Sequence, residues 1–194
     1  GPGTDNPAAA VIKIKDLLPA LSKTVDEKAR KPANLVSVIQ RLARAGKKVE
    51  IYPCRRPEDF LGVRTRQNLA EAVGILRERK LNELAGRGVT IYNPASTWVD
   101  LDVIIGRDTI LYPGVTIEGR TRIGKNCLIY PGVHISHSQI GDRVRVFSSS
   151  VMDGAIIEDD AQVGPFSRLR PKTVLRAGAR VGNFVEVKNT DFGK

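Results

Sequence analysis

The sequence contains few cysteine, histidine and aromatic residues, and these shortages exclude several classes of protein. Only two cysteines occur among its 194 residues, and Cys54 and Cys127 stand too far apart to indicate a disulfide framework or a cysteine metal motif. The two histidines, His134 and His137, are too few for a site that needs three. We therefore expect a protein of the reducing cytoplasm that binds no metal.

Long apolar runs are also missing. No stretch approaches the roughly 18 residues that a membrane-spanning helix needs. The first residues lack the basic and apolar regions of a secretory signal. We therefore expect no membrane partner.

The positive charge is concentrated in the first half of the chain. The formal net charge is +10, and residues 1–98 hold 18 Lys and Arg against 10 Asp and Glu, while residues 99–194 hold 13 against 11. The basic residues are scattered, without interleaved aromatic residues or a nucleic-acid motif. We interpret them as a solvated surface and predict no nucleic-acid partner, whereas a small anionic substrate would suit a basic protein.

The first 97 residues are predicted to form an α-rich arm. Apolar residues at positions 35, 38, 39 and 42 follow helical spacing, so a helix is expected from Pro32 to Gly46, with the glycine as its C-terminal cap. No glycine-rich phosphate loop occurs here, so this half does not form a nucleotide-binding domain. The other expected elements are a weaker helix from Asp16 to about Ala29, strands over Lys48–Pro53 and Val89–Tyr92, and a helix from Thr65 to about Ala85 with Leu69, Val73 and Leu76 on one face.

From Val99 onward, a branched aliphatic residue recurs at intervals of six, except for two steps of five residues, from Ile135 to Ile140 and from Val146 to Val151. This period fits neither a plain helix nor an alternating strand, and it is typical of a hexapeptide parallel β-helix, in which the aliphatic residue points into a triangular prism. Residues 98–194 are therefore predicted to form about five coils of 18 residues. The expected inward residues are Val99, Ile105, Leu111, Ile117, Ile123, Ile129, Ile135, Ile140, Val146, Val151, Ile157, Val163, Leu169, Leu175, Val181 and Val187.

Small residues and glycines occupy fixed places in this repeat. The fourth residue after each aliphatic one is usually small, from Val103 to Val185, and is also expected to point inward. Glycine follows several of the aliphatic residues, where it would allow the positive φ of a tight corner. These glycines are Gly106, Gly124, Gly141, Gly164 and Gly182.

Two stretches near the end resemble a known enzyme family. Residues 164–171 read GPFSRLRP, and residues 181–188 read VGNFVEVK. Both closely resemble the acetyltransferase half of the bacterial bifunctional GlmU family, which combines a glucosamine-1-phosphate N-acetyltransferase with an N-acetylglucosamine-1-phosphate uridylyltransferase. The resemblance covers roughly residues 47–194. It implies a left-handed β-helix, a role in UDP-N-acetylglucosamine synthesis and acetyl-CoA as the acyl donor.

The resemblance assigns a sugar-phosphate site to two residues of this chain. It implies that Arg170, before the proline, and Lys188, at the end of the second stretch, bind glucosamine 1-phosphate. A guanidinium offers paired donors to phosphate oxygens and an ammonium adds a point charge. The two residues are 18 positions apart, which is one coil, so they are expected to stack on the same face.

Other parts of the family pattern are missing. The histidine that serves as the catalytic base follows the lysine by about a dozen residues in the family and lies outside this sequence. At the position of an asparagine that holds magnesium in the family, this chain has Arg64, and a cation does not ligate a cation. The 194-residue chain is therefore expected to be inactive by itself, with no catalytic residue and no magnesium site.

Hexapeptide proteins commonly form trimers with sites between subunits, and this resemblance implies a homotrimer. Two other interpretations remain open. One is a different hexapeptide acyltransferase, or a degenerate paralogue, and the other is a noncatalytic scaffold whose basic arm binds a partner.

Overall fold

The computed structural model describes residues 10–22, 35–50, 52 and 56–193. The chain divides into two compact units, residues 1–64 and residues 65–194. The α-rich segment expected over residues 1–97 is thus divided, because its last third belongs to the second unit. Within the described residues, no helix is both long and apolar enough to cross a bilayer.

The first unit contains α1 (Ile14–Ser22), α2 (Leu35–Arg44) and a 3-10 turn, η1 (Pro57–Phe60). Helix α2 ends as predicted, because Gly46 takes a φ of 73° and the amide of Lys47 donates to the carbonyl of Leu42 at 3.0 Å. This pair of features is a glycine-based C-terminal cap. Residues 23–34, which include the expected helix start at Pro32 and the end of the earlier helix, lie outside the described residues.

The strand expected over Lys48–Pro53 is not found in its described part, residues 48–50 and 52. There, side chains along the segment bond to one another: Lys48 forms an ion pair with Glu50, and the Tyr52 hydroxyl donates to Glu50 at 2.9 Å. A lone strand has no partner to satisfy its backbone groups. Alternating polarity alone is therefore not enough to make a strand of these described residues.

The second unit begins with the long helix α3 (Arg66–Gly86). Its start is as predicted, since the Thr65 side chain accepts a hydrogen bond from the amide of Asn68 at 3.1 Å, which is a standard N-terminal cap. The expected apolar face is not buried, because Leu69 and Leu76 are exposed. Only the last turns join the core, through Leu81 and Leu84, where α3 contacts β1 and β2.

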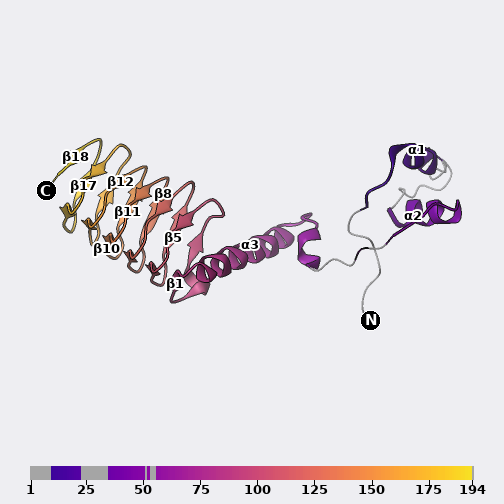
Figure 1. Ribbon diagram of the computed structural model, residues 1–194. Coiled ribbons are helices and arrows are strands. Elements are labelled where there is room, and N and C mark those ends of the chain that lie inside the picture. Colours follow the sequence, from indigo (N-terminus) through magenta and orange to yellow (C-terminus); the bar gives the residue numbers. More distant parts are fainter. Residues whose placement is uncertain (1–9, 23–34, 51, 53–55, 194) are drawn as a thin grey trace. The chain divides into compact units, whose positions relative to one another are not determined.

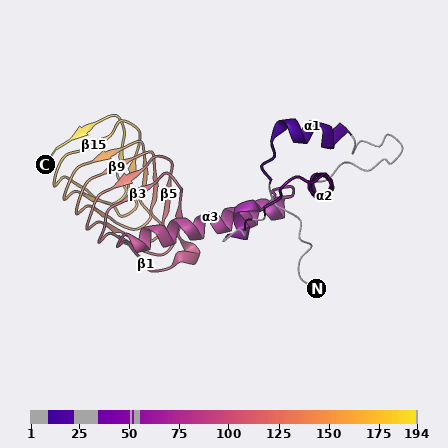
Figure 2. The ribbon, with the colours of Figure 1, turned by 45° about the vertical axis from the view of Figure 1, so that its right-hand side comes forward.

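The rest of the unit is a three-sided parallel β-helix (Figures 1 and 2). Each side is a six-stranded parallel sheet, and each strand pairs with the strand one coil away. Sheet A contains β1 (Thr90–Ile91), β4 (Ile110–Leu111), β7 (Leu128–Ile129), β10 (Arg145–Val146), β13 (Gln162–Val163) and β16 (Arg180–Val181). Sheet B contains β2 (Trp98–Val99), β5 (Thr116–Glu118), β8 (His134–Ser136), β11 (Val151–Asp153), β14 (Arg168–Leu169) and β17 (Glu186–Val187). Sheet C contains β3 (Ile104–Ile105), β6 (Arg122–Ile123), β9 (Gln139–Ile140), β12 (Ile156–Ile157), β15 (Val174–Leu175) and β18 (Asp191–Phe192).

The hexapeptide fold is confirmed, with about six turns rather than five. The additional turn arises because β1, expected as a separate strand before residue 98, is the first strand of sheet A and pairs with β4. A short 3-10 turn, η2 (Pro94–Ser96), leads from it to β2. The aliphatic repeat fills one continuous core from Val99 to Val181.

Two inward positions differ from prediction. Val151 is 39% exposed, and Met152 is fully buried in its place, because Met152 pairs with Ile135 in the coil below. The five-residue step predicted between Val146 and Val151 therefore lies between Met152 and Ile157. Val185, expected inward, is 38% exposed because it lies in the last described coil, where no further coil covers it.

The glycines after the aliphatic residues are, with one exception, not required for the positive φ that was predicted. Of the five, only Gly164 has a positive φ. At Gly106, a Cβ atom would lie 2.7 Å from the carbonyl carbon and oxygen of Gly124 in the next coil. Glycine is required there by the close approach of stacked backbones and not by a left-handed corner.

Candidate functional site

The predicted site residues lie at the end of sheet B, in adjacent coils. Strands β14 and β17 pair so that Leu169 lies beside Val187. The amide of Arg170 donates to the carbonyl of Val187 at 2.9 Å. Lys188 follows directly, so the two cations occupy the same register position, with strands about 4.8 Å apart. The spacing of 18 residues between Arg170 and Lys188 thus corresponds to one coil, and the two residues lie side by side on sheet B.

Arg170 has a partner that the sequence reasoning did not identify. Its Nη1 donates to Glu186 Oε1 at 3.1 Å, and its side chain stays 41% exposed. Nε and Nη2 form no hydrogen bond with any described residue, so one edge of the guanidinium fork faces solvent. The signal was present in the sequence, since Glu186 lies two residues before Lys188 and alternate strand residues share a face.

Lys188 is exposed, and its ammonium pairs with no carboxylate in the described part of the chain. Its backbone carbonyl accepts a hydrogen bond from the Thr190 hydroxyl at 2.9 Å. No ion pair with a described residue therefore fixes the conformation of the Lys188 side chain. Arg170 and Lys188 together present two cations, partly offset by one carboxylate.

Both histidines lie in the coil that contains β8, two coils before Arg170 and three before Lys188, and each contacts a carboxylate. His134 Nε2 lies 2.8 Å from Glu118 Oε2, and His137 Nδ1 lies 3.3 Å from Asp153 Oδ1. No group of three or more potential ligands gathers among the described residues. Arg64, at the position that the resemblance gives to a magnesium ligand, is described and exposed, and it adds a cation and not a ligand.

The described cysteine is part of the core. Cys127 is buried, its Sγ donates to the Gly141 carbonyl at 3.1 Å, and burial raises the pKa of its thiol. A neutral buried thiol is a poor nucleophile. Cys54 lies outside the described residues.

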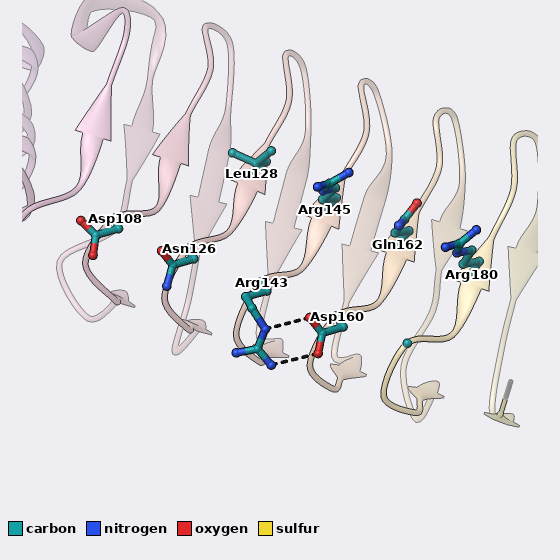
Figure 3. A pocket seen from close by; sticks show the side chains of 9 residues that line it. Asp108, Asn126, Leu128, Arg143, Arg145, Asp160, Gln162 and Arg180 are labelled. Atoms are coloured by element: carbon teal, nitrogen blue, oxygen red, sulfur yellow. Dashed lines mark hydrogen bonds and ion pairs between the residues drawn. The ribbon is translucent and has the colours of Figure 1, made fainter.

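An open groove with a volume of about 860 Å³ runs along sheet A and its neighbouring corner. Figure 3 shows Arg145, Gln162 and Arg180 in one row on successive strands, beside the Arg143–Asp160 ion pair at the corner. A second groove, of about 490 Å³, follows sheet C. Neither of these two grooves includes Arg170 or Lys188, which lie on sheet B.

Comparison with known proteins finds similar chains of one kind. Residues 99–191 match the family described as the GMPPB C-terminal domain. The bifunctional protein GlmU of Lactobacillus delbrueckii subsp. bulgaricus is 44% identical over 181 residues, which cover 93% of this chain and 39% of that protein. GlmU of Thermodesulfovibrio yellowstonii is 40% identical over 159 residues, covering 82% of this chain and 35% of that protein. Most of this chain therefore corresponds to a part of the GlmU proteins.

The resemblance read from the sequence is thereby confirmed. The chain spans about two fifths of the length of the GlmU proteins that it matches. Among solved structures, the acetyltransferase domain of PglB from Neisseria gonorrhoeae is similar with a TM-score of 0.45 and 18% identity, over 60% of this chain and 57% of that one.

Proposed function

We propose that this chain provides the phosphate-binding wall of a GlmU-type acetyltransferase site. The reaction is the transfer of an acetyl group from acetyl-CoA to the amine of glucosamine 1-phosphate. In the whole enzyme, a uridylyl transfer from UTP would follow. The observation that supports the proposal is the stacking of two cations in adjacent coils of sheet B, the half-buried Arg170 and the exposed Lys188.

The chemistry of these side chains fits a sugar phosphate. The solvent-facing edge of the Arg170 guanidinium can donate two parallel hydrogen bonds to phosphate oxygens, and Lys188 can add a third charged contact. Glu186 holds the other edge of Arg170 and so limits the orientations of the guanidinium. Anchoring the phosphate fixes one end of the sugar, which lowers the entropic cost of presenting its amine to an acyl donor.

Acetyl-CoA would supply the activated acyl group. The grooves along sheets A and C do not border Arg170 or Lys188, so we assign no residue of this chain to the coenzyme. We likewise propose no magnesium site.

We further propose that the chain acts in the cytoplasm as a homotrimer and that the 194-residue chain alone is inactive. The only two histidines of the sequence, His134 and His137, belong to a coil that lies two coils before Arg170. Neither is therefore placed beside the two cations as a general base. An assay of thiol release from acetyl-CoA with glucosamine 1-phosphate should show no turnover, and light scattering at tens of micromolar should give three times the monomer mass.

Binding of glucosamine 1-phosphate tests the proposal directly. An NMR titration should shift the amides around Arg170 and Lys188, and Arg170→Gln or Lys188→Gln should weaken binding about tenfold each, as for the loss of a charge-assisted hydrogen bond. Arg145→Gln is a matched control, because Arg145 is also an exposed strand arginine but lies on sheet A. If the control weakens binding as much as Arg170→Gln, the effect is general electrostatics and the site assignment fails.

A further inference from the structure

Four charged side chains form a square on the outer face of sheet B. Arg168 and Arg170 come from one coil, and Glu186 and Lys188 come from the next. Arg168 lies directly beside Glu186 in the strand register. Neighbouring strands are about 4.8 Å apart, and alternate residues along a strand are about 6.6 Å apart. All four side chains can therefore reach one ligand the size of a phosphate group.

Glu186, the one carboxylate in this square, forms a hydrogen bond with only one of the two arginines. Glu186 accepts a hydrogen bond from Arg170, its diagonal neighbour, at 3.1 Å. Arg168, its direct neighbour, is exposed, and its side chain makes no hydrogen bond or ion pair with any other described residue. Three cations thus face one anion, which leaves the square with a net charge of +2.

The preceding coil contributes one further carboxylate next to this square. Val151 lies beside Arg168 on that side and is apolar. Asp153 is one register position further, next to Arg170, but it accepts a hydrogen bond from the Ser136 hydroxyl at 2.9 Å and lies 3.3 Å from His137. Its carboxylate keeps its negative charge, but it bonds to side chains of the coil before it, on the side away from Glu186 and Lys188.

We propose that Arg168 is a third phosphate-binding residue and that it makes the site selective for dianionic phosphate monoesters over monoanionic diesters. The inference rests on the proposed function. A dianion balances the +2 charge of the square, whereas a phosphodiester leaves one positive charge uncompensated. Without Arg168 the square carries +1, and the two kinds of phosphate would bind more equally.

The experiment compares methyl phosphate with dimethyl phosphate by NMR titration of the whole chain at about pH 8, where a phosphate monoester is a dianion. The unsubstituted chain should bind methyl phosphate about tenfold more tightly than dimethyl phosphate. Arg168→Gln should remove most of this preference, mainly by weakening methyl phosphate binding. Arg168→Lys should retain part of it because the charge remains. Arg145→Gln, on sheet A, should leave both affinities unchanged.

The outcomes separate the inference from the proposed function. If Arg170→Gln weakens binding of both compounds while Arg168→Gln keeps the full preference, the role of Arg168 is refuted and the proposed function stands. If neither methyl phosphate nor glucosamine 1-phosphate shifts any sheet B amide at tens of millimolar, the proposed function fails, and the inference fails with it. Thermal melts of each variant establish that the solenoid remains folded.

Discussion

Replacing Gly106 by alanine should destabilise the solenoid, because the added methyl group would meet the backbone of the next coil. The new Cβ would lie 2.7 Å from the carbonyl carbon and oxygen of Gly124 and 2.8 Å from the amide nitrogen of Lys125. Backbone atoms cannot rotate away as a side chain does. The coils would have to separate by roughly 0.7 Å to reach ordinary van der Waals contact.

That separation has a second cost. The amide of Gly106 donates to the carbonyl of Ile123 at 2.9 Å, and a shift of this size would take the pair beyond a normal hydrogen bond. Overpacking costs about 1–3 kcal/mol, and the weakened hydrogen bond costs about 1 kcal/mol. The free energy of unfolding should fall by about 2–4 kcal/mol, and the midpoint of thermal unfolding by roughly 6–12 °C for a unit of this size.

Gly182→Ala is the matched control, because Gly182 occupies the same position of the repeat. No atom lies within 4 Å of its added Cβ, and its φ lies outside the left-handed region. This variant should melt within about 2 °C of the unsubstituted chain, or slightly higher, since alanine lowers the entropy of the unfolded state. Circular dichroism and differential scanning calorimetry measure both variants. If Gly106→Ala melts at the same temperature as Gly182→Ala, close backbone approach is not the reason for glycine.

Further substitutions test the register, the corners and the ion pairs. Met152→Ala should lower the free energy of unfolding by about 2–5 kcal/mol, while Val151→Ala should cost less than about 1 kcal/mol; urea denaturation that gives equal losses would contradict the register. Ser149 has a φ of 56°, so Ser149→Gly should stabilise the chain by up to about 1 kcal/mol, and a lower melting temperature would refute this. The pKa of Asp191 is held below its ordinary value of 3.8 by a hydrogen bond from Arg176. The stabilisation from this pair is therefore present above pH 3.8 and is lost as the pH falls through the lower folded-state pKa. NMR titration should show that pKa rising in Arg176→Gln, and an unchanged value would exclude the ion pair as its cause.

The sequence predicted the solenoid because one physical constraint repeats in every coil. An inward position must be aliphatic to be buried, and period six followed directly from that requirement. The start of α3 at Thr65 could also be predicted, since the Thr65 hydroxyl caps this helix. These features depend only on the residue itself and its near neighbours in the chain.

Other features depended on contacts between coils. Val151 and Met152 are both apolar and adjacent, so hydropathy could not decide which points inward; stacking on Ile135 decides it. Similarly, the register places Glu186 opposite Arg168, but the side-chain conformation pairs it with Arg170 instead. Neither choice can be derived from spacing alone.

Because the coils stack, the side of the prism on which a residue lies depends on its distance along the chain, counted in steps of six residues. Adjacent coils repeat the same three sides, so removing one whole coil of 18 residues before Arg170 would lower that residue by about 4.8 Å and keep it on sheet B. Removing six residues would instead move every later residue back by one side of the prism. Arg170 and Lys188 would then point from a different sheet while the aliphatic core remained in register. In this architecture, the height of a site and the direction it faces can be altered independently, each in fixed steps.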